Sequence, residues 1–209
     1  KMKKKIGIID YEVGNIGSLS NAISFLGHEP MLVNNPKRII NFDRLILPGV
    51  GHFSTAMIKL QDHGFVSYLL EYLKDNSKKL LGICLGMQLL GTFSEEGNTK
   101  GLSLLDFDIK KLRNKNINNN FKIPNIGWRS VKKINNSLLL DEIKNDDFYF
   151  VHSYAAHSTN KDIIISKTNY CEEFISIVEK KNIFGVQFHP EKSDKAGLKL
   201  LKNFIEKIN

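Results

Sequence analysis

Cys84 is the residue of this chain whose surroundings most resemble those of a catalytic nucleophile. It lies in Gly82-Ile83-Cys84-Leu85-Gly86, after a short apolar run and before a helix-like run. This spacing resembles a nucleophile elbow, a sharp strand-to-helix turn in which glycines let neighbouring backbones approach closely. A helix N-terminus at the thiol would favour the thiolate. The alternative is a buried structural cysteine, and this stretch alone does not decide between the two.

A second polar cluster, His189-Pro190-Glu191-Lys192-Ser193, follows the strand-like run Phe184–Phe188. His189 could accept the proton of the Cys84 thiol, and Glu191 could orient the imidazole and stabilise its charged form. A lone histidine is more often structural than catalytic. This one follows a core strand, has a carboxylate two residues later and matches a cysteine in an elbow, so we predict a Cys84–His189–Glu191 triad.

A glycine-rich loop, Pro48-Gly49-Val50-Gly51, follows the strand-like run Arg44–Leu47. It is either an ordinary strand-to-helix turn or a set of backbone N–H groups that face a ligand. Ligands of open α/β sheets bind outside the carboxyl ends of the strands. The loop and Cys84 both follow strands, so we expect them to converge on one site.

The first half of the chain alternates strand-like and helix-like runs, and this pattern predicts a parallel, doubly wound sheet flanked by helices. The second half, from Leu104 to Val186, consists mostly of short strand-like pieces, which predict antiparallel strands added to that sheet. A final helix is expected over Ala196–Ile208. The fold class is therefore α/β, in a single domain over residues 1–209. Expected strands are Lys5–Asp10, Met31–Val33, Arg44–Leu47 and Leu80–Ile83; expected helices include Leu19–Leu26, Phe53–Leu60 and Phe65–Leu73.

Local signals add three smaller expectations. Asn15 or Ser18 is expected to cap the first helix with its side chain. The segment Asn116–Asn120 is expected to be a surface loop because of its polar, Asn-rich composition. Cys171 precedes two glutamates, and neighbouring carboxylates disfavour a thiolate, so we expect this cysteine to be inert.

The bulk composition excludes several classes of protein. The chain has 209 residues, of which 42% are hydrophobic, and no apolar run approaches the roughly 20 residues that a membrane span needs. Two cysteines do not make a disulfide framework, and no signal peptide is expected, so we predict a cytoplasmic protein. The net charge of +8 could attract anions, but the lysines are dispersed without interleaved aromatic residues. We therefore expect neither a nucleic-acid nor a membrane partner.

Taken together, the segments around Cys84 and His189 resemble those of class I, triad-type glutamine amidotransferases. The resemblance narrows to the glutaminase subunits of imidazole glycerol phosphate synthases and spans nearly the whole chain. It rests on Asp10-Tyr11-Glu12-Val13-Gly14-Asn15, Pro48-Gly49-Val50-Gly51-His52-Phe53, Lys100-Gly101-Leu102-Ser103-Leu104, Gly127-Trp128, Phe150-Val151-His152-Ser153-Tyr154 and His189-Pro190-Glu191-Lys192-Ser193.

The resemblance implies that Cys84 attacks the side-chain amide of L-glutamine. The oxyanion that forms needs preorganised donors. The implied donors are the backbone N–H of Leu85 and the loop at Val50 and Gly51. Gln88 lies about one helical turn past Cys84 and is expected to contact the substrate. By resemblance, the other substrate-binding residues are Glu96, Ser153 and Tyr154. A solvated loop carboxylate is the alternative for Glu96. No metal and no cofactor are expected, and His52, His152 and His157 receive no catalytic role.

In the family, ammonia passes through a channel into a separate (β/α)8-barrel synthase subunit, which forms imidazole glycerol phosphate in histidine biosynthesis. The resemblance implies a heterodimer in which Asn15, Trp128, Tyr154 and Lys192 contact that barrel. The family pattern Pro-His-x-Gly-Trp-Asn reads Pro124-Asn125-Ile126-Gly127-Trp128-Arg129 here. An alternative is therefore a paralogous subunit that supplies ammonia to a sugar-modifying enzyme of surface polysaccharide synthesis. A regulatory module without activity and a cysteine peptidase of related fold are the alternatives from other classes.

Overall fold

The computed structural model describes residues 3–114, 121–144 and 146–208. The expected surface loop Asn116–Asn120 lies outside these residues. Within the described ranges, no helix combines the length and the apolar character that crossing a membrane requires.

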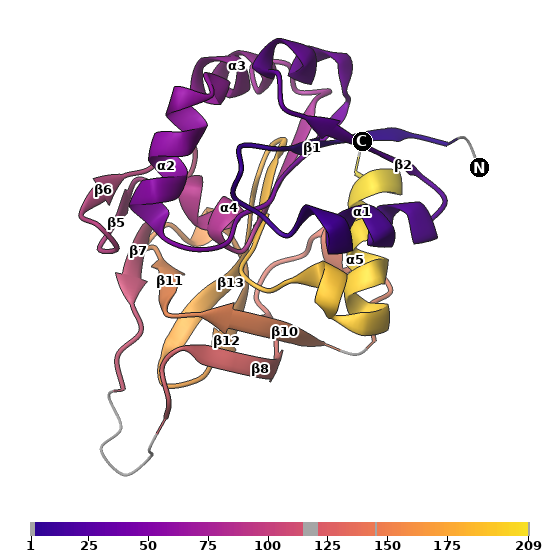
Figure 1. Ribbon diagram of the computed structural model, residues 1–209. Coiled ribbons are helices and arrows are strands. Elements are labelled where there is room, and N and C mark those ends of the chain that lie inside the picture. Colours follow the sequence, from indigo (N-terminus) through magenta and orange to yellow (C-terminus); the bar gives the residue numbers. More distant parts are fainter. Residues whose placement is uncertain (1–2, 115–120, 145, 209) are drawn as a thin grey trace.

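Five parallel strands form the centre of the structure (Figure 1). In sheet order they are β2 (Glu29–Val33), β1 (Lys5–Ile9), β3 (Arg44–Leu47), β4 (Lys79–Ile83) and β14 (Ile183–Val186). Strands β3 and β4 are buried at every position, as is typical of parallel strands covered on both faces. The predicted α/β fold with a mostly parallel sheet is confirmed.

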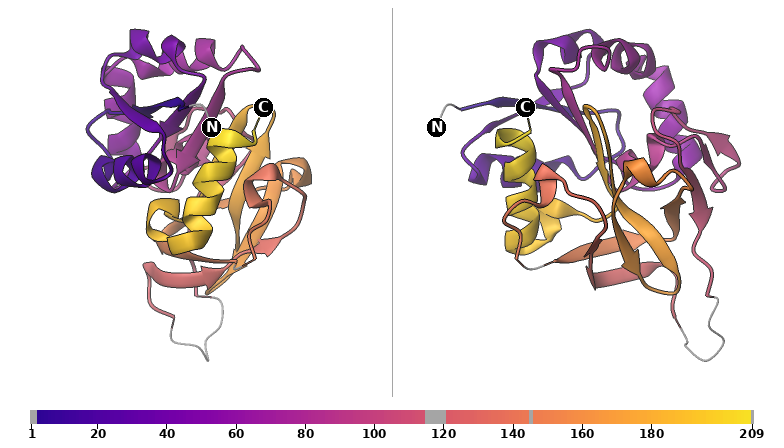
Figure 2. Two further views of the ribbon diagram at one scale, coloured as in Figure 1. Left: turned by 90° about the vertical axis from the view of Figure 1, so that its right-hand side faces the viewer. Right: turned by 180° about the vertical axis from the view of Figure 1, so that it is seen from behind.

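Helices cover both faces of this parallel sheet (Figures 1 and 2). Helices α1 (Ile16–Phe25) and α5 (Asp194–Glu206) share one hydrophobic cluster with Ile6 and Ile8 of β1. On the other face, α2 (Phe53–Asp62) and α3 (Phe65–Tyr72) share a second cluster with Leu45 and Leu47 of β3. Successive strand residues point to opposite faces, so each strand supplies both clusters.

The second half of the chain extends the sheet with mostly antiparallel strands, as the sequence predicts. Strand β13 (Glu173–Lys180) runs antiparallel to β14 and also pairs with β11 (Tyr154–His157) and β12 (Ile164–Asn169). The outer strands are β7 (Asp108–Lys111), β5 (Phe93–Ser94), β6 (Thr99–Lys100) and β9 (Lys132–Lys133); of these, β5 and β7 pair in parallel.

Two strands of the second half form a sheet of their own rather than joining the large one. Strands β8 (Asn125–Ser130) and β10 (Asp147–His152) pair antiparallel, and Figure 1 shows them below the main sheet. The ring of Phe148 stacks on Phe188, with 4.0 Å between the ring centroids, and Phe150 packs edge-on against the same ring. These aromatic contacts bury one face of β10 against the core, so the small sheet lies over the carboxyl ends of β4 and β14.

Element ends differ from the expectations by a few residues, and the capping prediction was wrong. Helix α1 begins at Ile16 with Asn15 in the N-cap position, but the Asn15 side chain makes no capping hydrogen bond. Strand β14 ends at Val186, two residues before the expected end.

The short helices are α4 (Leu85–Leu89), η1 (Pro36–Asn41), η2 (Leu138–Leu140), η3 (Lys161–Ile163) and η4 (Pro190–Lys192).

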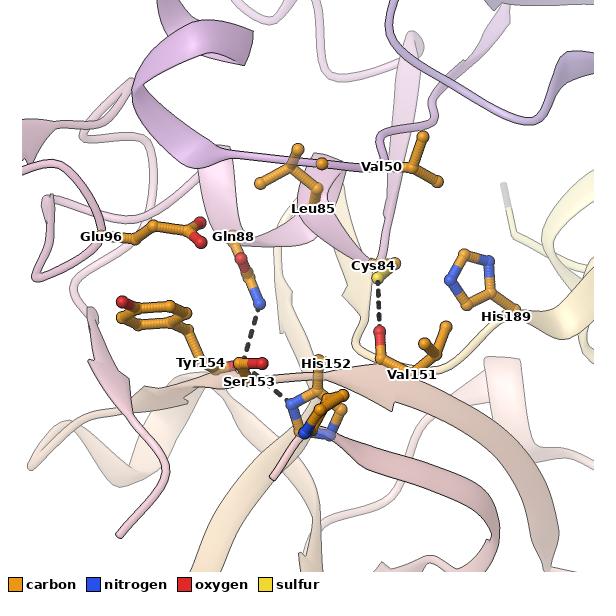
Figure 3. A pocket seen from close by; sticks show the side chains of 12 residues that line it. Val50, Cys84, Leu85, Gln88, Glu96, Val151, His152, Ser153, Tyr154 and His189 are labelled. Atoms are coloured by element: carbon orange, nitrogen blue, oxygen red, sulfur yellow. Dashed lines mark hydrogen bonds between the residues drawn. The ribbon is translucent and has the colours of Figure 1, made fainter. Parts of the chain in front are cut away.

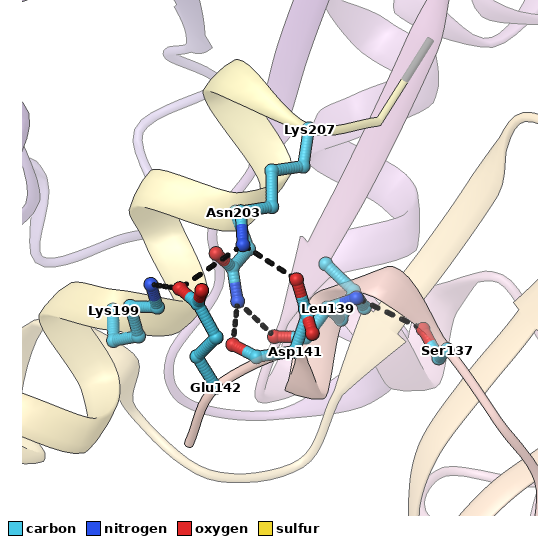
Figure 4. Close-up of polar contacts among 7 residues, drawn as sticks. All are labelled: Ser137, Leu139, Asp141, Glu142, Lys199, Asn203 and Lys207. Carbon is cyan, nitrogen blue, oxygen red and sulfur yellow. Dashed lines mark hydrogen bonds and ion pairs between the residues drawn. The ribbon is translucent and has the colours of Figure 1, made fainter.

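Polar contacts fix helix α5 against the segment that follows η2 (Figure 4). The amide nitrogen of buried Asn203 donates to the carbonyl oxygens of Leu139 and Asp141, at 3.0 and 2.8 Å. At the helix surface, Lys199 and Lys207 form ion pairs with Glu142. Helix α5 lies directly after η4 in the chain, so these contacts also restrict the position of η4.

Candidate active site

Cys84 occupies the sharp turn that the sequence predicts between β4 and α4. Its backbone has φ 53° and ψ −111°, which is a strained conformation for a residue with a side chain. A Cβ on Gly86 would lie 1.8 Å from the carbonyl oxygen of Leu47, and a Cβ on Gly82 would lie 2.7 Å from the carbonyl oxygen of Gly86. Gly86 is therefore needed for the turn to fit against β3, and Gly82 for β4 to fit against the first turn of α4.

The pairing of β4 with β14 brings His189 to Cys84. Gly82 and Ile83 are in register with Gly185 and Val186, and the N–H of Cys84 donates to the carbonyl oxygen of Val186 at 2.8 Å. The chain continues from β14 to His189 at the same edge of the sheet. Figure 3 shows the His189 imidazole beside Cys84 with one ring nitrogen turned toward the sulfur.

Glu191 lies in η4 and contacts the other ring nitrogen of His189. Its Oε1 is 2.8 Å from His189 Nδ1, and both side chains are 3% exposed. Burial alone would lower the pKa of His189, but the neighbouring Cys84 and the hydrogen bond with Glu191 outweigh burial and raise this pKa to about 10. The imidazole therefore lies between the Cys84 thiol and a carboxylate that orients the ring.

Gln187 is a neighbour of the thiol to which sequence reasoning gave no role. Its Nε2 lies 3.8 Å from the Cys84 sulfur, and the carbonyl oxygen of Val151 lies 3.9 Å from the same sulfur. A donor directed at the sulfur stabilises the thiolate, whereas a carbonyl oxygen accepts the proton of the thiol. Gln187 is completely buried next to a strand end, and this burial of an amide is the signal that could have indicated a role.

A cavity of about 370 Å³ opens in front of Cys84, a size typical of small-molecule sites. It lies between the end of β4, the loop after β3 and the turn that follows β10 (Figure 3). The structure thus brings the predicted triad and the predicted substrate-binding residues to one place. The lining residues are Val50, Gly51, Cys84, Leu85, Gln88, Glu96, Pro124, Val151, His152, Ser153, Tyr154 and His189.

Two of the four residues predicted to bind substrate, Gln88 and Glu96, also have structural partners. The amide nitrogen of Gln88 donates to the carbonyl oxygen of Tyr154 and to Oε1 of Gln187, both at 3.0 Å. Gln88 therefore has its carbonyl oxygen left to offer a ligand. Glu96 is half-buried, and its Oε2 accepts the backbone N–H of Phe53 at 2.9 Å, at the first turn of α2. Glu96 is therefore held at the rim of the cavity rather than free in solvent.

The glycine-rich loop after β3 is fixed by a hydrogen bond from the buried side chain of Tyr11. The Tyr11 hydroxyl donates to the carbonyl oxygen of Pro48 at 2.8 Å, and the side chain is completely buried. Burial and the neighbouring Cys84 raise the pKa of Tyr11 far above its usual range, so the hydroxyl keeps its proton. Val50 and Gly51 line the cavity on the same side as Leu85 (Figure 3), so the loop can present backbone donors to a group held at Cys84.

Ser193, the last residue of the second motif, fixes the backbone that carries His189. Its hydroxyl donates to the carbonyl oxygen of His189 at 2.6 Å and accepts the N–H of Tyr149 at 2.9 Å. The N–H of His189 in turn donates to the carbonyl oxygen of Tyr149 at 2.9 Å. Strand β10 and the His189 segment are therefore locked together by backbone hydrogen bonds.

The residues expected to contact a partner are exposed or half-buried, and Tyr154 also lines the cavity. Asn15 and Lys192 are exposed, Trp128 is 48% exposed, and Tyr154 is half-buried at the cavity wall. Apolar side chains are exposed in the same part of the molecule: Val50, Ile123 and Ile126. Exposed apolar groups at the rim of a site are typical of a surface that another protein covers.

The two positions that depart from the family pattern, Asn125 and Arg129, both lie on strand β8. Asn125 is completely buried, so it cannot touch a partner directly. The guanidinium of Arg129 lies over the ring of Tyr170, 4.5 Å from its centroid, and donates to the carbonyl oxygens of Trp128 and Ile126. Both side chains make their contacts within this chain.

Comparison with known proteins gives relatives over nearly the whole length. The family model described as glutamine amidotransferase class-I matches residues 7–208. The imidazole glycerol phosphate synthase subunit HisH 2 of Methanococcus maripaludis is 46% identical over 202 residues, which are 96% of this chain and 98% of that protein. The chloroplastic imidazole glycerol phosphate synthase hisHF of Arabidopsis thaliana is 41% identical over 203 residues, 96% of this chain but 34% of that longer protein.

Solved structures agree on the fold. PurLQS from Thermotoga maritima superimposes with a TM-score of 0.74 at 18% identity, covering all of both chains. Together with the match over residues 7–208, this similarity leaves one assignment: the chain belongs to the class I glutamine amidotransferases.

Proposed function

We propose that this chain is the glutaminase subunit of an imidazole glycerol phosphate synthase. It would hydrolyse L-glutamine to glutamate and ammonia and deliver the ammonia to a separate (β/α)8-barrel subunit in histidine biosynthesis. The observation that carries this proposal is the buried Cys84–His189–Glu191 arrangement at a cavity of about 370 Å³. Relatives such as the Methanococcus maripaludis subunit, at 46% identity, support the assignment of the pathway.

The proposed reaction begins with attack by the Cys84 thiolate on the side-chain amide carbon of glutamine. The negative charge that develops on the amide oxygen would be stabilised by the backbone N–H of Leu85 and by the loop at Val50 and Gly51, which line the same cavity. His189 gives its proton to the leaving nitrogen, the C–N bond breaks, and ammonia departs. The product at this stage is a γ-glutamyl thioester on Cys84.

Water completes the reaction. His189, now neutral, accepts a proton from water as the water oxygen attacks the thioester carbon. The C–S bond breaks, glutamate leaves, and Cys84 and His189 again share one proton. Glu191 keeps the imidazole oriented throughout, because its Oε1 is 2.8 Å from His189 Nδ1. Glu96 would bind the amino group of the substrate, and the Ser153–Tyr154 turn would lie near its backbone end.

The exposed side chains around the cavity support a partner on this face. Asn15, Trp128, Tyr154 and Lys192 are the proposed contacts, together with the exposed apolar residues Val50, Ile123 and Ile126. Covering this face would shield ammonia from solvent, in which it would be protonated and lost. The hisHF protein of Arabidopsis is about three times as long as the region that this chain matches. Its name, hisHF, adds a letter F to the letter H of the HisH subunits.

The alternative of a sugar-modifying pathway was raised by positions 125 and 129 of the sequence. Because Asn125 is buried and Arg129 contacts Tyr170, these positions do not alter the partner-facing surface directly. We therefore propose the histidine-pathway partner. Cys84 and Cys171 do not form a disulfide, which supports a reducing, cytoplasmic setting. The shared sheet supports one domain over residues 1–209.

The decisive experiment uses the Cys84→Ala variant in complex with the barrel subunit that co-purifies from native cells. Glutamine-dependent turnover of the histidine-pathway intermediate should disappear, while turnover with added ammonium should persist. Loss of both activities in an intact complex would overturn the division of labour. A co-purifying barrel that does not turn over that intermediate would favour the sugar-modifying pathway.

A further inference from the structure

The two faces of strand β8 have different environments. Ile126, Trp128 and Ser130 are exposed, whereas Asn125 is completely buried and Gly127 and Arg129 are half-buried. Alternate residues of a strand point to opposite faces. One face of β8 is therefore exposed, and the other, with Asn125 buried and Arg129 half-buried, is turned toward the molecule.

Asn125 forms a hydrogen-bonded pair with His152 across the small sheet. The two residues are in register on β8 and β10, and Asn125 Nδ2 lies 3.0 Å from His152 Nε2. An amide nitrogen can only donate, so His152 Nε2 accepts and the ring proton is on Nδ1. That Nδ1–H donates to the carbonyl oxygen of Tyr154 at 2.8 Å.

The same carbonyl oxygen connects this pair to the nucleophile. It also accepts the amide nitrogen of Gln88 at 3.0 Å, as Figure 3 shows. Gln88 donates to Gln187 at 3.0 Å, and Gln187 Nε2 lies 3.8 Å from the Cys84 sulfur. A continuous chain of hydrogen bonds therefore runs from β8 to the sulfur and passes through the proposed substrate-binding turn.

The surroundings of His152 keep it neutral, as the pair with Asn125 requires. Burial lowers the pKa of His152 to about 4, and the charges of His189 and Arg129 act in the same direction, whereas the hydrogen bond to Tyr154 acts against them. Phe174 packs edge-on against the imidazole, with 4.9 Å between the centroids. A neutral ring accepts at one nitrogen, and this is what the Asn125 amide needs.

We propose that Asn125 is a positioning residue for glutamine hydrolysis: its amide holds His152 in the Nδ1–H tautomer, and His152 in turn holds the Tyr154 carbonyl on which Gln88 is anchored. This role rests on the proposed glutaminase reaction. Asn125 Oδ1 is buried without a partner among the described residues, which costs free energy. An apolar residue would fill the same space without that cost. The feature that Asn125 adds over an apolar residue is therefore its Nδ2 donor to His152.

The tautomer can be measured without any activity, by 15N NMR of the histidine rings in the wild-type chain. His152 should be neutral with the proton on Nδ1 from pH 5 to 8. In Asn125→Asp a carboxylate faces Nε2, so His152 should carry both protons at neutral pH. In Asn125→Leu only the Tyr154 carbonyl still favours the proton on Nδ1, so the population of the Nε2–H tautomer should rise. A wild-type ring protonated on Nε2 would overturn the proposal.

The kinetic test measures kcat and KM for glutamine in the complex with the barrel subunit. Asn125→Leu should lower kcat/KM by about tenfold, mainly through KM, because a buried acceptor loses its donor. Asn125→His, which restores the residue of the family pattern and can donate an N–H, should stay within about threefold of wild type. Ser130→Ala is the matched control, because it removes an exposed hydrogen bond to Asp147 in the same strand pair.

A double-mutant cycle shows whether Asn125 acts through His152. In a His152→Phe background, Asn125→Leu should have no further effect on kcat/KM. Additive losses in this cycle, or an unchanged KM in folded Asn125→Leu, would overturn the positioning role. A wild-type complex with no glutaminase activity would instead refute the proposed function and leave the NMR result to stand alone.

Discussion

At the scale of single residues, two histidines at one cavity have opposite protonation behaviour. The pKa of His189 is raised to about 10 because Cys84 and Glu191 outweigh burial, and the pKa of His152 is lowered to about 4 because burial dominates. Groups whose environments move their pKa values apart take different chemical roles. His189 can carry the proton of the thiol, whereas His152 serves as a neutral donor and acceptor.

His152 should make folding stability depend on pH on the acid side. Its pKa is about 4 in the folded chain and about 6.5 when unfolded, so between these values the unfolded state binds a proton that the folded state rejects. Stability should therefore fall by about 3 kcal/mol as the pH drops from 6.5 to 4. Urea unfolding across this window should show a smaller loss for His152→Gln than for wild type. Equal losses would contradict the assignment.

The residues of the triad could be predicted from the sequence because short local motifs carry them. Cys84 needs glycines two positions away on either side, and Glu191 lies two positions after His189. Asn125 could not be assigned in the same way. Its role depends on the register of β8 with β10, which places it opposite His152, and register is a tertiary property that no local pattern in this segment determines.

At the scale of elements, the loop after β3 depends on the residue that follows β1. Tyr11 reaches across to the Pro48 carbonyl oxygen from the neighbouring strand end. A Cβ on Gly49 would lie 2.9 Å from that hydroxyl and 2.8 Å from the N–H of Gly86. The loop is therefore packed between Tyr11 and the first turn of α4, with little space to shift.

Tyr11→Phe should impair catalysis more than substrate binding. It leaves the buried Pro48 carbonyl without its donor, which should cost about 1 kcal/mol of stability. A loosened loop should lower kcat by about fivefold with a small change in KM, measured by glutamine hydrolysis in the complex. Tyr72→Phe is the matched control, because the Tyr72 hydroxyl also donates to a backbone carbonyl, of Lys79 at 3.2 Å. An equal loss of kcat in both variants would show a general stability effect.

The sequence predicts the bounds of several helices and strands well, but it does not predict to which sheet every strand belongs. The bounds of β3 agree with the prediction, and α2 and α3 begin at the predicted residues Phe53 and Phe65. Strands β8 and β10 were expected in the main sheet but form a second one. Their sequences are equally compatible with both arrangements, and the packing of Phe148 on Phe188 decides between them.

At the scale of the whole molecule, the C-terminal helix α5 packs against the segment that carries His189 and Glu191 of the triad. A Cβ on Gly197 of α5 would lie 1.9 Å from the carbonyl oxygen of Pro190, the residue between His189 and Glu191. Helix α5 is itself anchored by Asn203 and the lysines at its surface (Figure 4). The position of Glu191 therefore depends on a helix at the far end of the chain.

Gly197→Ala should displace η4 and with it Glu191. The clash involves backbone on one side and a fixed helix on the other, so it cannot be relieved by a side-chain rotation. We expect a fall of about tenfold or more in kcat/KM together with a lower Tm. Gly17→Ala in α1 is the control, because a Cβ there has no neighbour within 4 Å; its activity should be unchanged. Full activity in folded Gly197→Ala would show that η4 is supported elsewhere.

The hydrogen bond from Cys84 to Val186 has a consequence for how related enzymes can diversify. Nucleophile and base follow adjacent parallel strands that are joined by backbone hydrogen bonds, and the spacing of such strands is nearly constant, at about 4.8 Å. The chemical step is thus built into the backbone framework of the sheet. The exposed face of β8, with Ile126, Trp128 and Ser130, lies outside this framework, so a lineage can acquire a new ammonia acceptor by substitutions there without rebuilding its thiol chemistry.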